Sequence, residues 1–166
     1  MIKEIVKCEK LVSGKPLVLK LEADRSDCET LAARFDWIDV ATLNAEIKLK
    51  AIAKDAFHVS GQIECAIIQR CRVTENPVPE SLLIKVDERF AIVEEENTEE
   101  AEIDPMAMTV EAIENEEIPV GEMIAQLVGI EASPWPRDAA ADEYMKRDEI
   151  DPTNPFASLA ELKKKL

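Results

Sequence analysis

Hydrophobic and polar residues alternate in three long runs between Thr42 and Val93. In each run, mostly apolar residues occupy every second position, which is the pattern of a strand with one buried and one wet face. The runs are 43–53, 59–73 and 82–92, and turn sequences at 54–57 and 74–79 separate them. The pattern therefore predicts three strands in an antiparallel meander, around which the rest of the chain is organised.

Two other segments have helical spacing, one on each side of the meander. The first follows two short β-prone runs at 2–6 and 16–21, and it opens on Ser26 with Glu29 three residues later, a capping-box pattern. The second starts near Val120 and carries Glu122 in its first turn, where the helix dipole favours a carboxylate. Its apolar stripe comprises Val120, Met123, Ile124, Leu127 and Val128. We expect both helices to cover the apolar side of the sheet, as in an α+β domain whose meander forms a partly closed sheet.

The end of the chain is predicted to be an appendage. Residues 138–152 are polar, rich in alanine and expected to be mobile, whereas Asn154 followed by Pro155 predicts a short C-terminal helix with Phe156 on its apolar side. Such a short helix is marginal alone, so it docks on its own domain, folds on a partner or stays unfolded. The expected organisation is one α+β domain over 1–137 and a mobile segment over 138–166.

The net charge of −15 is concentrated in one part of the chain. Residues 90–136 contain 13 acidic residues and no basic one, while the flanking parts are almost balanced. Much of this stretch, about 94–117, is predicted to be a flexible acidic loop because like charges repel. It either keeps the protein soluble or steers a basic partner toward it, and it argues against an extensive nucleic-acid footprint.

Candidate chemistry is mostly excluded by the residue types present. The four glycines do not form a phosphate-binding loop, and His58, the only histidine, sits at the predicted turn 54–57 with no nucleophile beside it. Cys65 and Cys71 are too far apart along one strand to share a disulfide or a zinc ion. We expect no enzyme activity, no cofactor, no metal and no membrane segment, with free thiols in a reducing cytoplasm.

The end of the second predicted strand leaves two questions open. Gln69 and Cys71 fall on the core-facing side, where a buried amide needs hydrogen-bond partners. Arg70 and Arg72 fall on the wet side. With Lys85 or Arg89 they form a small cationic patch, or they belong to a solvated face crossed by ion pairs to Glu64 or Asp87.

Four segments in a fixed order resemble the bacterial YceD family, the large ribosomal RNA subunit accumulation proteins. The quoted segments are Gly61-x-Ile63 leading to Gln69-Arg70-Cys71-x-Val73-Thr74, Glu117-Ile118-x-Val120-Gly121-Glu122, Pro134-Trp135-Pro136-Arg137 and Asn154-Pro155-Phe156-Ala157-x-Leu159-x-x-Leu162. The Arg that follows Pro-Trp-Pro is similar to the alphaproteobacterial branch. Some family members carry a Cys-x-x-Cys where this chain has Gln69-x-Cys71, so no metal site carries over. Pro119 also replaces an aspartate that is frequent in the family.

The resemblance implies a non-enzymatic factor that supports accumulation of 23S ribosomal RNA. Three mechanisms remain open: an adaptor that holds a basic ribosomal protein or assembly factor, a direct binder of large-subunit rRNA through a small arginine patch, and a thiol sensor at Cys71. The candidate interaction residues are Gln69, Arg70, Cys71, Arg72, Glu122, Pro134, Trp135, Pro136, Arg137 and Phe156.

Overall fold

The computed structural model describes residues 3–11, 14–92, 110–113 and 115–146. The chain forms two compact units. Unit 1 comprises Met1–Gln69 and Pro79–Ser133, and unit 2 comprises Arg70–Val78 and Pro134–Leu166. Unit 2 therefore combines two stretches that are far apart in the sequence.

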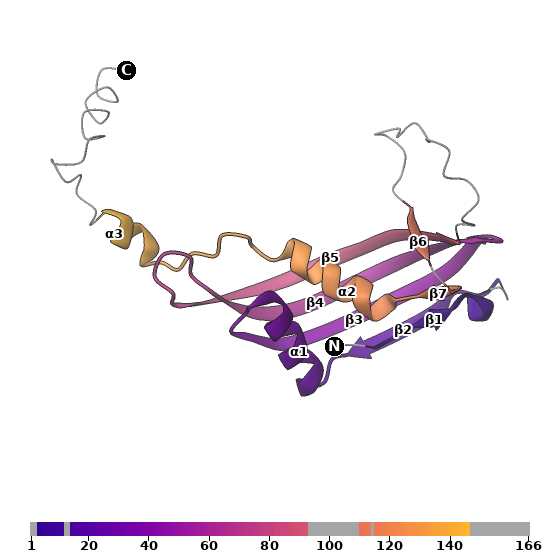
Figure 1. Cartoon of the computed structure of the whole chain (residues 1–166), viewed down its shortest axis with the longest axis horizontal. Helices are drawn as coiled ribbons and strands as arrows, with labels where there is room; N and C mark the ends of the chain where they lie inside the picture. Colours follow the sequence, from indigo (N-terminus) through magenta and orange to yellow (C-terminus); the bar gives the residue numbers. More distant parts are fainter. Residues whose placement is uncertain (1–2, 12–13, 93–109, 114, 147–166) are drawn as a thin grey trace, which may run out of the picture. The chain divides into compact units, whose positions relative to one another are not determined.

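A five-stranded sheet forms the framework of the fold, in the order β2-β3-β4-β5-β6 (Figure 1). Its strands are β2 (Leu17–Glu22), β3 (Asp39–Ala53), β4 (Ala56–Arg70), β5 (Pro77–Ile92) and β6 (Glu111–Ile113). β3 pairs antiparallel with both β2 and β4, whereas β6 runs parallel to the end of β5. The predicted α+β class is confirmed, with a mostly antiparallel sheet. This sheet is open, with β2 and β6 at its edges.

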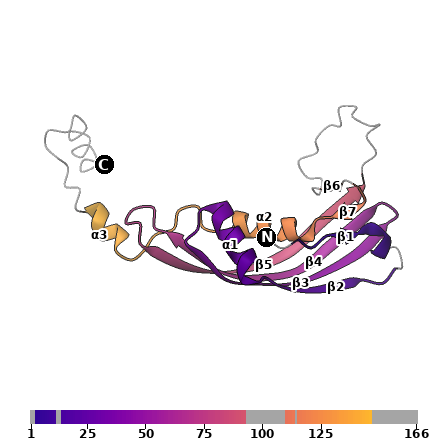
Figure 2. The same cartoon turned by 60° about the horizontal axis from the view of Figure 1, so that its bottom comes forward.

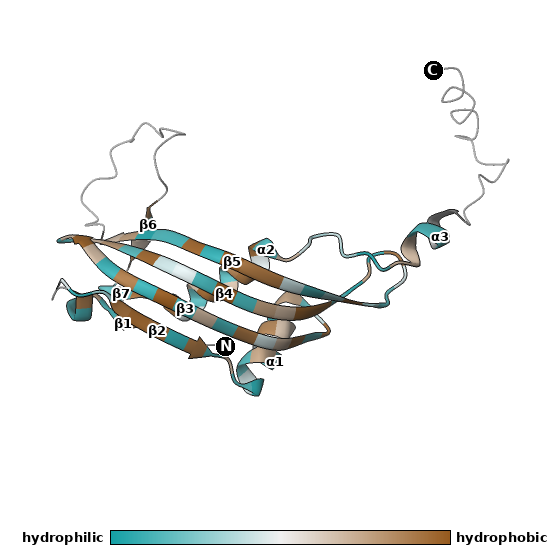
Figure 3. Ribbon diagram, turned by 180° about the vertical axis from the view of Figure 1, so that it is seen from behind, coloured by the Kyte–Doolittle hydropathy of each residue, from teal (hydrophilic) through white to brown (hydrophobic). Residues whose placement is uncertain are grey.

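The two faces of the sheet follow the sequence pattern. Along β3, buried and exposed positions alternate from Leu43 to Lys50, and Figure 3 shows the same alternation of hydrophobic and hydrophilic residues along the strands. The strand ends differ from the prediction, because β4 ends at Arg70 and β5 already begins at Pro77. A turn at 71–76 replaces the predicted strand end. Proline is tolerated at the first position of a strand, where its missing N–H disrupts no ladder.

Two helices cover one face of the sheet in unit 1 (Figure 2). They are α1 (Arg25–Phe35) and α2 (Val120–Glu131). Leu31 of α1 and Ile124 of α2 belong to the same buried cluster as Ile47 and Ile63 of the sheet. Each fully buried side chain of this size contributes about 1.5–3 kcal/mol, so the covered face is the main source of stability in unit 1.

The start of α1 corrects one sequence prediction. Asp24 is the N-cap, and its Oδ1 accepts a hydrogen bond from the backbone N–H of Asp27 at 2.8 Å. Ser26 lies inside the helix, where its carbonyl accepts from the Thr30 hydroxyl at 2.8 Å. Aspartate and serine are equally good caps, so local sequence does not decide between them.

The two covering helices are joined by charge and by close packing. Arg34 donates two hydrogen bonds to the carboxylate of Glu122, at 2.8 and 2.7 Å. Phe35 stacks on Trp37 with ring centroids 4.8 Å apart. A Cβ placed on Gly129 of α2 would lie 2.5 Å from the Phe35 ring. The glycine therefore permits the close approach of α2 to the end of α1.

Short elements in the acidic part of the chain correct the predicted loop. β6 lies within its range and β7 (Glu117–Ile118) begins at its last residue. β7 pairs antiparallel with β1 (Val6–Lys7), which leads into the 3₁₀ helix η1 (Cys8–Leu11). Ile113 and Ile118 are 6% and 0% exposed, so these strands form where apolar residues enter the core. The remainder of the predicted loop, 93–109 and 114, lies outside the described residues.

The start of the predicted mobile segment is helical. α3 spans Ala141–Lys146 in unit 2, and Ala141 is 1% exposed. Ala141 is thus a buried residue inside an otherwise polar stretch, and composition alone does not reveal its burial. The predicted C-terminal helix, including Phe156, lies outside the described residues.

Candidate interaction site in unit 2

Unit 2 brings together most of the residues that the sequence singles out. Its first stretch contains the turn from β4 into β5, and its second follows α2. The backbone N–H of Arg72 donates to the carbonyl of Pro136 at 3.0 Å, so the two stretches lie side by side (Figure 1). The predicted residues assembled here are Arg70, Cys71, Arg72, Pro134, Trp135, Pro136 and Arg137.

The Cys71 sulfur lies at the centre of this arrangement. It is 2% exposed and accepts hydrogen bonds from the backbone N–H groups of Val73, Thr74 and Asp138, at 3.5, 3.4 and 3.4 Å. Burial raises the pKa of the Cys71 thiol, but the hydrogen bonds from Thr74, Asp138 and Val73 outweigh burial, and the pKa lies below its ordinary value. The sulfur therefore acts mainly as an acceptor that fixes the turn.

Asp138 closes the same network from the second stretch. One carboxylate oxygen accepts from the Asn76 amide at 2.6 Å, and the other accepts from the Cys71 thiol at 3.4 Å. The hydrogen bond from Asn76 lowers the pKa of Asp138. Burial raises this pKa by less, so the pKa lies below its ordinary value. The turn is closed further by the N–H of Cys71 donating to the Asn76 carbonyl at 2.8 Å. Neither Asp138 nor Asn76 was singled out from the sequence.

Around this network, four side chains extend into solvent. Trp135 is 74% exposed, and the three arginines are also exposed. We name these residues the arginine–tryptophan patch: Arg70, Arg72, Trp135 and Arg137. The carboxylates of Glu64 and Asp87, expected to pair with Arg70 and Arg72, accept instead from Gln62 and His58. Within the described residues the two arginines form no ion pair, so their guanidinium groups are available to a ligand.

Gln69, at the end of unit 1, has the partners that its burial requires. It is 5% exposed, and its amide donates to Glu80 at 2.8 Å and to the carbonyl of Ser133 at 3.1 Å. The Ser133 N–H donates to both oxygens of Glu80 at 3.3 Å. The sequence placed Gln69 on the core-facing side and left open which groups would bond its amide, and the structure identifies Glu80 and Ser133. Gln69 thus has a structural role at the point where the chain enters unit 2.

Glu122 lies apart from this site, within unit 1. Its carboxylate is occupied by Arg34 and also accepts from the Gln126 amide at 3.0 Å. The hydrogen bonds from Arg34 lower the pKa of Glu122. We infer that this residue joins the covering helices rather than contacting a partner. The last predicted site residue, Phe156, is outside the described part of the chain.

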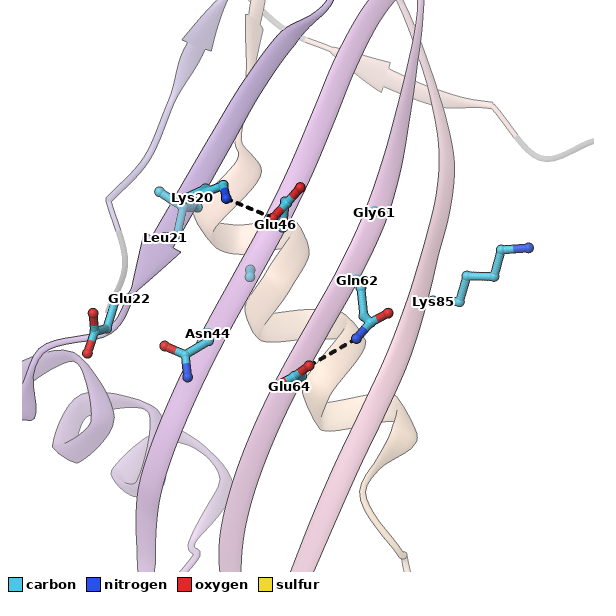
Figure 4. A pocket seen from close by; sticks show the side chains of 10 residues that line it. Lys20, Leu21, Glu22, Asn44, Glu46, Gly61, Gln62, Glu64 and Lys85 are labelled. Atoms are coloured by element: carbon cyan, nitrogen blue, oxygen red, sulfur yellow. Dashed lines mark hydrogen bonds and ion pairs between the residues drawn. The ribbon is translucent and has the colours of Figure 1, made fainter.

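The open face of the sheet in unit 1 contains a hollow of about 840 Å³ (Figure 4). Charges of both signs line it, and two interactions already link them: Lys20 with Glu46 at 3.3 Å, and the Gln62 amide with Glu64 at 3.0 Å. The described lining contains no cysteine, histidine or hydroxyl side chain. His58 lies in β4, not in the predicted turn, and its Nε2 is 2.7 Å from Asp87 Oδ1. The lining of this hollow is thus mostly polar and solvated.

The four cysteines are all free and buried. Burial raises the pKa of the Cys65 thiol to about 12, with a smaller contribution from Cys28. Among the described residues there is no group of three or more acidic, cysteine or histidine residues placed to hold a metal ion. No helix in that part of the chain has the length and hydropathy needed to cross a membrane.

Comparison of the chain with protein-family models, with curated proteins and with solved structures gave no match. The likeness to the YceD family therefore rests on the four short segments alone.

Proposed function

We propose that this protein is a non-enzymatic adaptor in large-subunit ribosome assembly. It holds a basic ribosomal protein or assembly factor and in this way supports accumulation of 23S ribosomal RNA. The resemblance to the YceD family supplies the biological setting of this proposal. The physical support comes from how charge is distributed along the chain.

One observation carries the proposal: the excess of acidic over basic residues is concentrated in one stretch of the chain. Residues 90–136 contain 13 acidic residues and no basic one, and the three arginines of the arginine–tryptophan patch lie outside that stretch. A field of one sign raises the encounter rate with an oppositely charged protein. Ribosomal proteins that have not yet bound RNA are such partners, because their basic surfaces lack their counterions. The exposed patch offers the arginine and tryptophan side chains that commonly dominate specific contacts.

The test is titration of the purified full-length protein with individual large-subunit ribosomal proteins, at two salt concentrations. We expect at least one of them to bind, with an affinity that falls as salt rises. The variants Trp135→Ala and Arg72→Ala should weaken binding by about tenfold, whereas Lys50→Ala on the open sheet face should not. Absence of salt-sensitive binding to every ribosomal protein would overturn the proposal.

A second candidate function is direct binding of exposed rRNA. The observation that favours it is Trp135, which is 74% exposed and lies two residues before the exposed Arg137, because single-stranded bases stack on aromatic rings beside cationic groups. Three arginines can neutralise about three phosphates, so the salt dependence should be shallow, with a slope of about −2 on logarithmic axes. Binding of 23S fragments that is lost in Trp135→Ala, without binding of any ribosomal protein, would favour this function over the adaptor.

The structure meets only one of the two requirements of the thiol-sensor hypothesis, a lowered thiol pKa but not an accessible sulfur. The pKa of Cys71 is lowered, yet the sulfur is 2% exposed and hydrogen bonded to three N–H groups. A redox sensor needs both a thiolate and access for the oxidant. We therefore assign Cys71 to the structure of the turn.

A further inference from the structure

We propose that a hollow next to β6 and β7 in unit 1 receives one apolar side chain from a basic segment of the partner protein. This inference rests on the proposed adaptor function and identifies the site at which the partner protein is recognised. The hollow has a volume of about 300 Å³ and is lined by Ile5, Ala112, Ile113, Glu117 and Pro119. That is the lower end of ligand-pocket size, which suits one large side chain rather than a cofactor.

Four of the five residues that line the hollow are apolar. Of these, Ile5 is 52% exposed and Ile113 is 6% exposed. Val110, which leads into β6 but does not line the hollow, is 50% exposed. Exposed aliphatic side chains around a concave surface are a feature of binding sites. An apolar side chain placed here would remove these groups from water.

The rim of the hollow is acidic. Glu117 lines the hollow, Glu111 precedes Ala112, and Glu116 precedes Glu117. Two lysines, Lys3 and Lys7, lie two residues on either side of Ile5 in the sequence. Lys7 is the register partner of Glu117. Four of the five lining residues have sequence positions within or beside the stretch 90–136, which has no basic residue. An occupant flanked by lysine and arginine therefore matches the rim, whereas a second copy of a chain with net charge −15 would be repelled.

The turn beside the hollow has a strained backbone. Asn115 and Glu116 have φ angles of 54° and 55°, in the left-handed region that residues other than glycine rarely adopt. The Glu116 carbonyl is held by the N–H of Cys8 at 2.9 Å. Strain of this kind persists only where the surroundings fix it, and it is concentrated at binding sites. The hydrogen bond from Cys8 therefore fixes Glu116 in this turn without a ligand.

An acidic surface alone would hold a cationic segment in any register. One apolar residue inserted in the hollow fixes the register, because only one alignment removes that residue from water. The acidic residues then set the rate of encounter, and the hollow sets which basic segment is retained. This division explains how a strongly acidic protein can select one basic partner among many.

The test uses two synthetic nonapeptides of lysine and arginine, one with leucine and one with serine at the central position. Binding to the full-length protein is followed by fluorescence anisotropy at low and moderate salt. We expect the leucine peptide to bind about tenfold more tightly than the serine peptide. Raising the salt should weaken both peptides equally and leave their ratio unchanged, because the apolar contact is not screened.

Two variants and a matched control locate the contact. Ala112→Phe fills the hollow from an exposed position, and Ile5→Asp makes its wall polar. Each should remove the advantage of the leucine peptide. Ile52→Asp is the control, because Ile52 is also 52% exposed and is not part of the hollow. The Glu111→Gln variant should weaken both peptides and preserve their ratio.

Equal binding of the two peptides, or an advantage of leucine that survives Ala112→Phe, would overturn the inference while leaving the adaptor function intact. Failure of both peptides in a protein that still binds a ribosomal protein would also overturn it. Sedimentation that shows a dimer abolished by Ala112→Phe would assign the hollow to a second copy. A larger loss of Tm in Ile5→Asp than in Ile52→Asp would mean that the protein's own chain covers Ile5, and would contradict the proposal.

Discussion

Each of the two units is stabilised internally by a different kind of interaction. In unit 1, the hydrophobic cluster runs from Val6 to Ala132 and contains all of the clustered buried side chains that the structure describes. In unit 2, the centre is the buried sulfur of Cys71, which meets the partly exposed Asp138 through hydrogen bonds. Burial of apolar surface is non-directional and tolerates change if volume is kept. A hydrogen-bonded centre requires defined donors and acceptors.

This difference explains where candidate interaction residues can stand. A sheet covered by helices offers stability but commits its apolar side chains to the core. The turn of unit 2 commits mainly backbone groups, so the side chains of Arg72 and Trp135 remain in solvent. The lesson is that a binding surface with exposed cationic and aromatic groups is built most easily where the backbone, not the side chains, provides the stability. Substitutions at particular positions test this contrast.

The largest effect is expected at Gly61, where strand packing in unit 1 is tightest. Its φ is 155°, and a Cβ would lie 2.1 Å from the carbonyl oxygen of Glu46. Gly61→Ala should therefore lower the free energy of unfolding by about 2–5 kcal/mol, measured by urea denaturation. Gly14→Ala is the control, because Gly14 also has a positive φ, of 73°, but no atom within 4 Å of the added Cβ. Equal losses in the two variants would mean that packing around Gly61 is not the cause.

A smaller effect is expected at Glu80, where unit 1 contains a hydrogen-bonded centre of its own. Glu80→Ala leaves the Gln69 amide and the Ser133 N–H without their acceptor, and should lower the free energy of unfolding by about 1–3 kcal/mol. Glu80→Gln keeps one acceptor oxygen and should recover part of the loss. If Glu80→Ala is as stable as the native protein in urea, buried polar groups matter less in unit 1 than we infer.

The Cys71→Ala variant tests whether unit 2 unfolds locally without the unfolding of unit 1. Removal of the sulfur leaves three N–H groups without an acceptor. We expect the local opening free energy, from hydrogen exchange of residues 73–76, to fall by about 1–2 kcal/mol. The urea midpoint of the whole protein should change little. A matching fall in that midpoint would show that the two units unfold together and would remove the contrast.

The smallest effect is the response of unit 2 to acid. The hydrogen bond from Asn76 lowers the pKa of Asp138 below its ordinary value of 3.8. A carboxylate with a lower pKa in the folded state contributes stability above its unfolded pKa and loses it as the pH falls through its folded pKa. Hydrogen exchange of residues 71–76, corrected for the intrinsic rate, should therefore accelerate as the pH falls below about 4.

Asn76→Ala is the control for this response, because it removes the first cause of the lowered pKa of Asp138. The acid dependence should shrink in that variant. Unit 1 contains the same sign of effect, since Arg34 lowers the pKa of Glu122 and His58 lowers that of Asp87. An identical acid response in Asn76→Ala would assign the dependence in unit 2 to another group.

The sequence by itself determined the elements whose evidence is local. Alternation with a period of two identified the three long strands and their buried faces, and helical spacing identified α2 almost to its ends. It also placed Gln69 on the core-facing side of its strand, where the structure finds it buried. These properties follow from neighbours within one or two turns of the chain, because side-chain direction is fixed by backbone geometry.

Only the tertiary structure decided which distant groups meet. Cys71 and Asp138 are 67 residues apart, and Arg34 and Glu122 are 88 residues apart. It also decided that the chain leaves β4 at Arg70, that Asp24 rather than Ser26 caps α1, and that two short strands form inside the acidic stretch. A hydrogen bond between distant residues leaves no periodic trace in the sequence, because its donor and acceptor types occur throughout the chain. Their pairing is selected only when the packed sheet and helices bring them within about 3 Å.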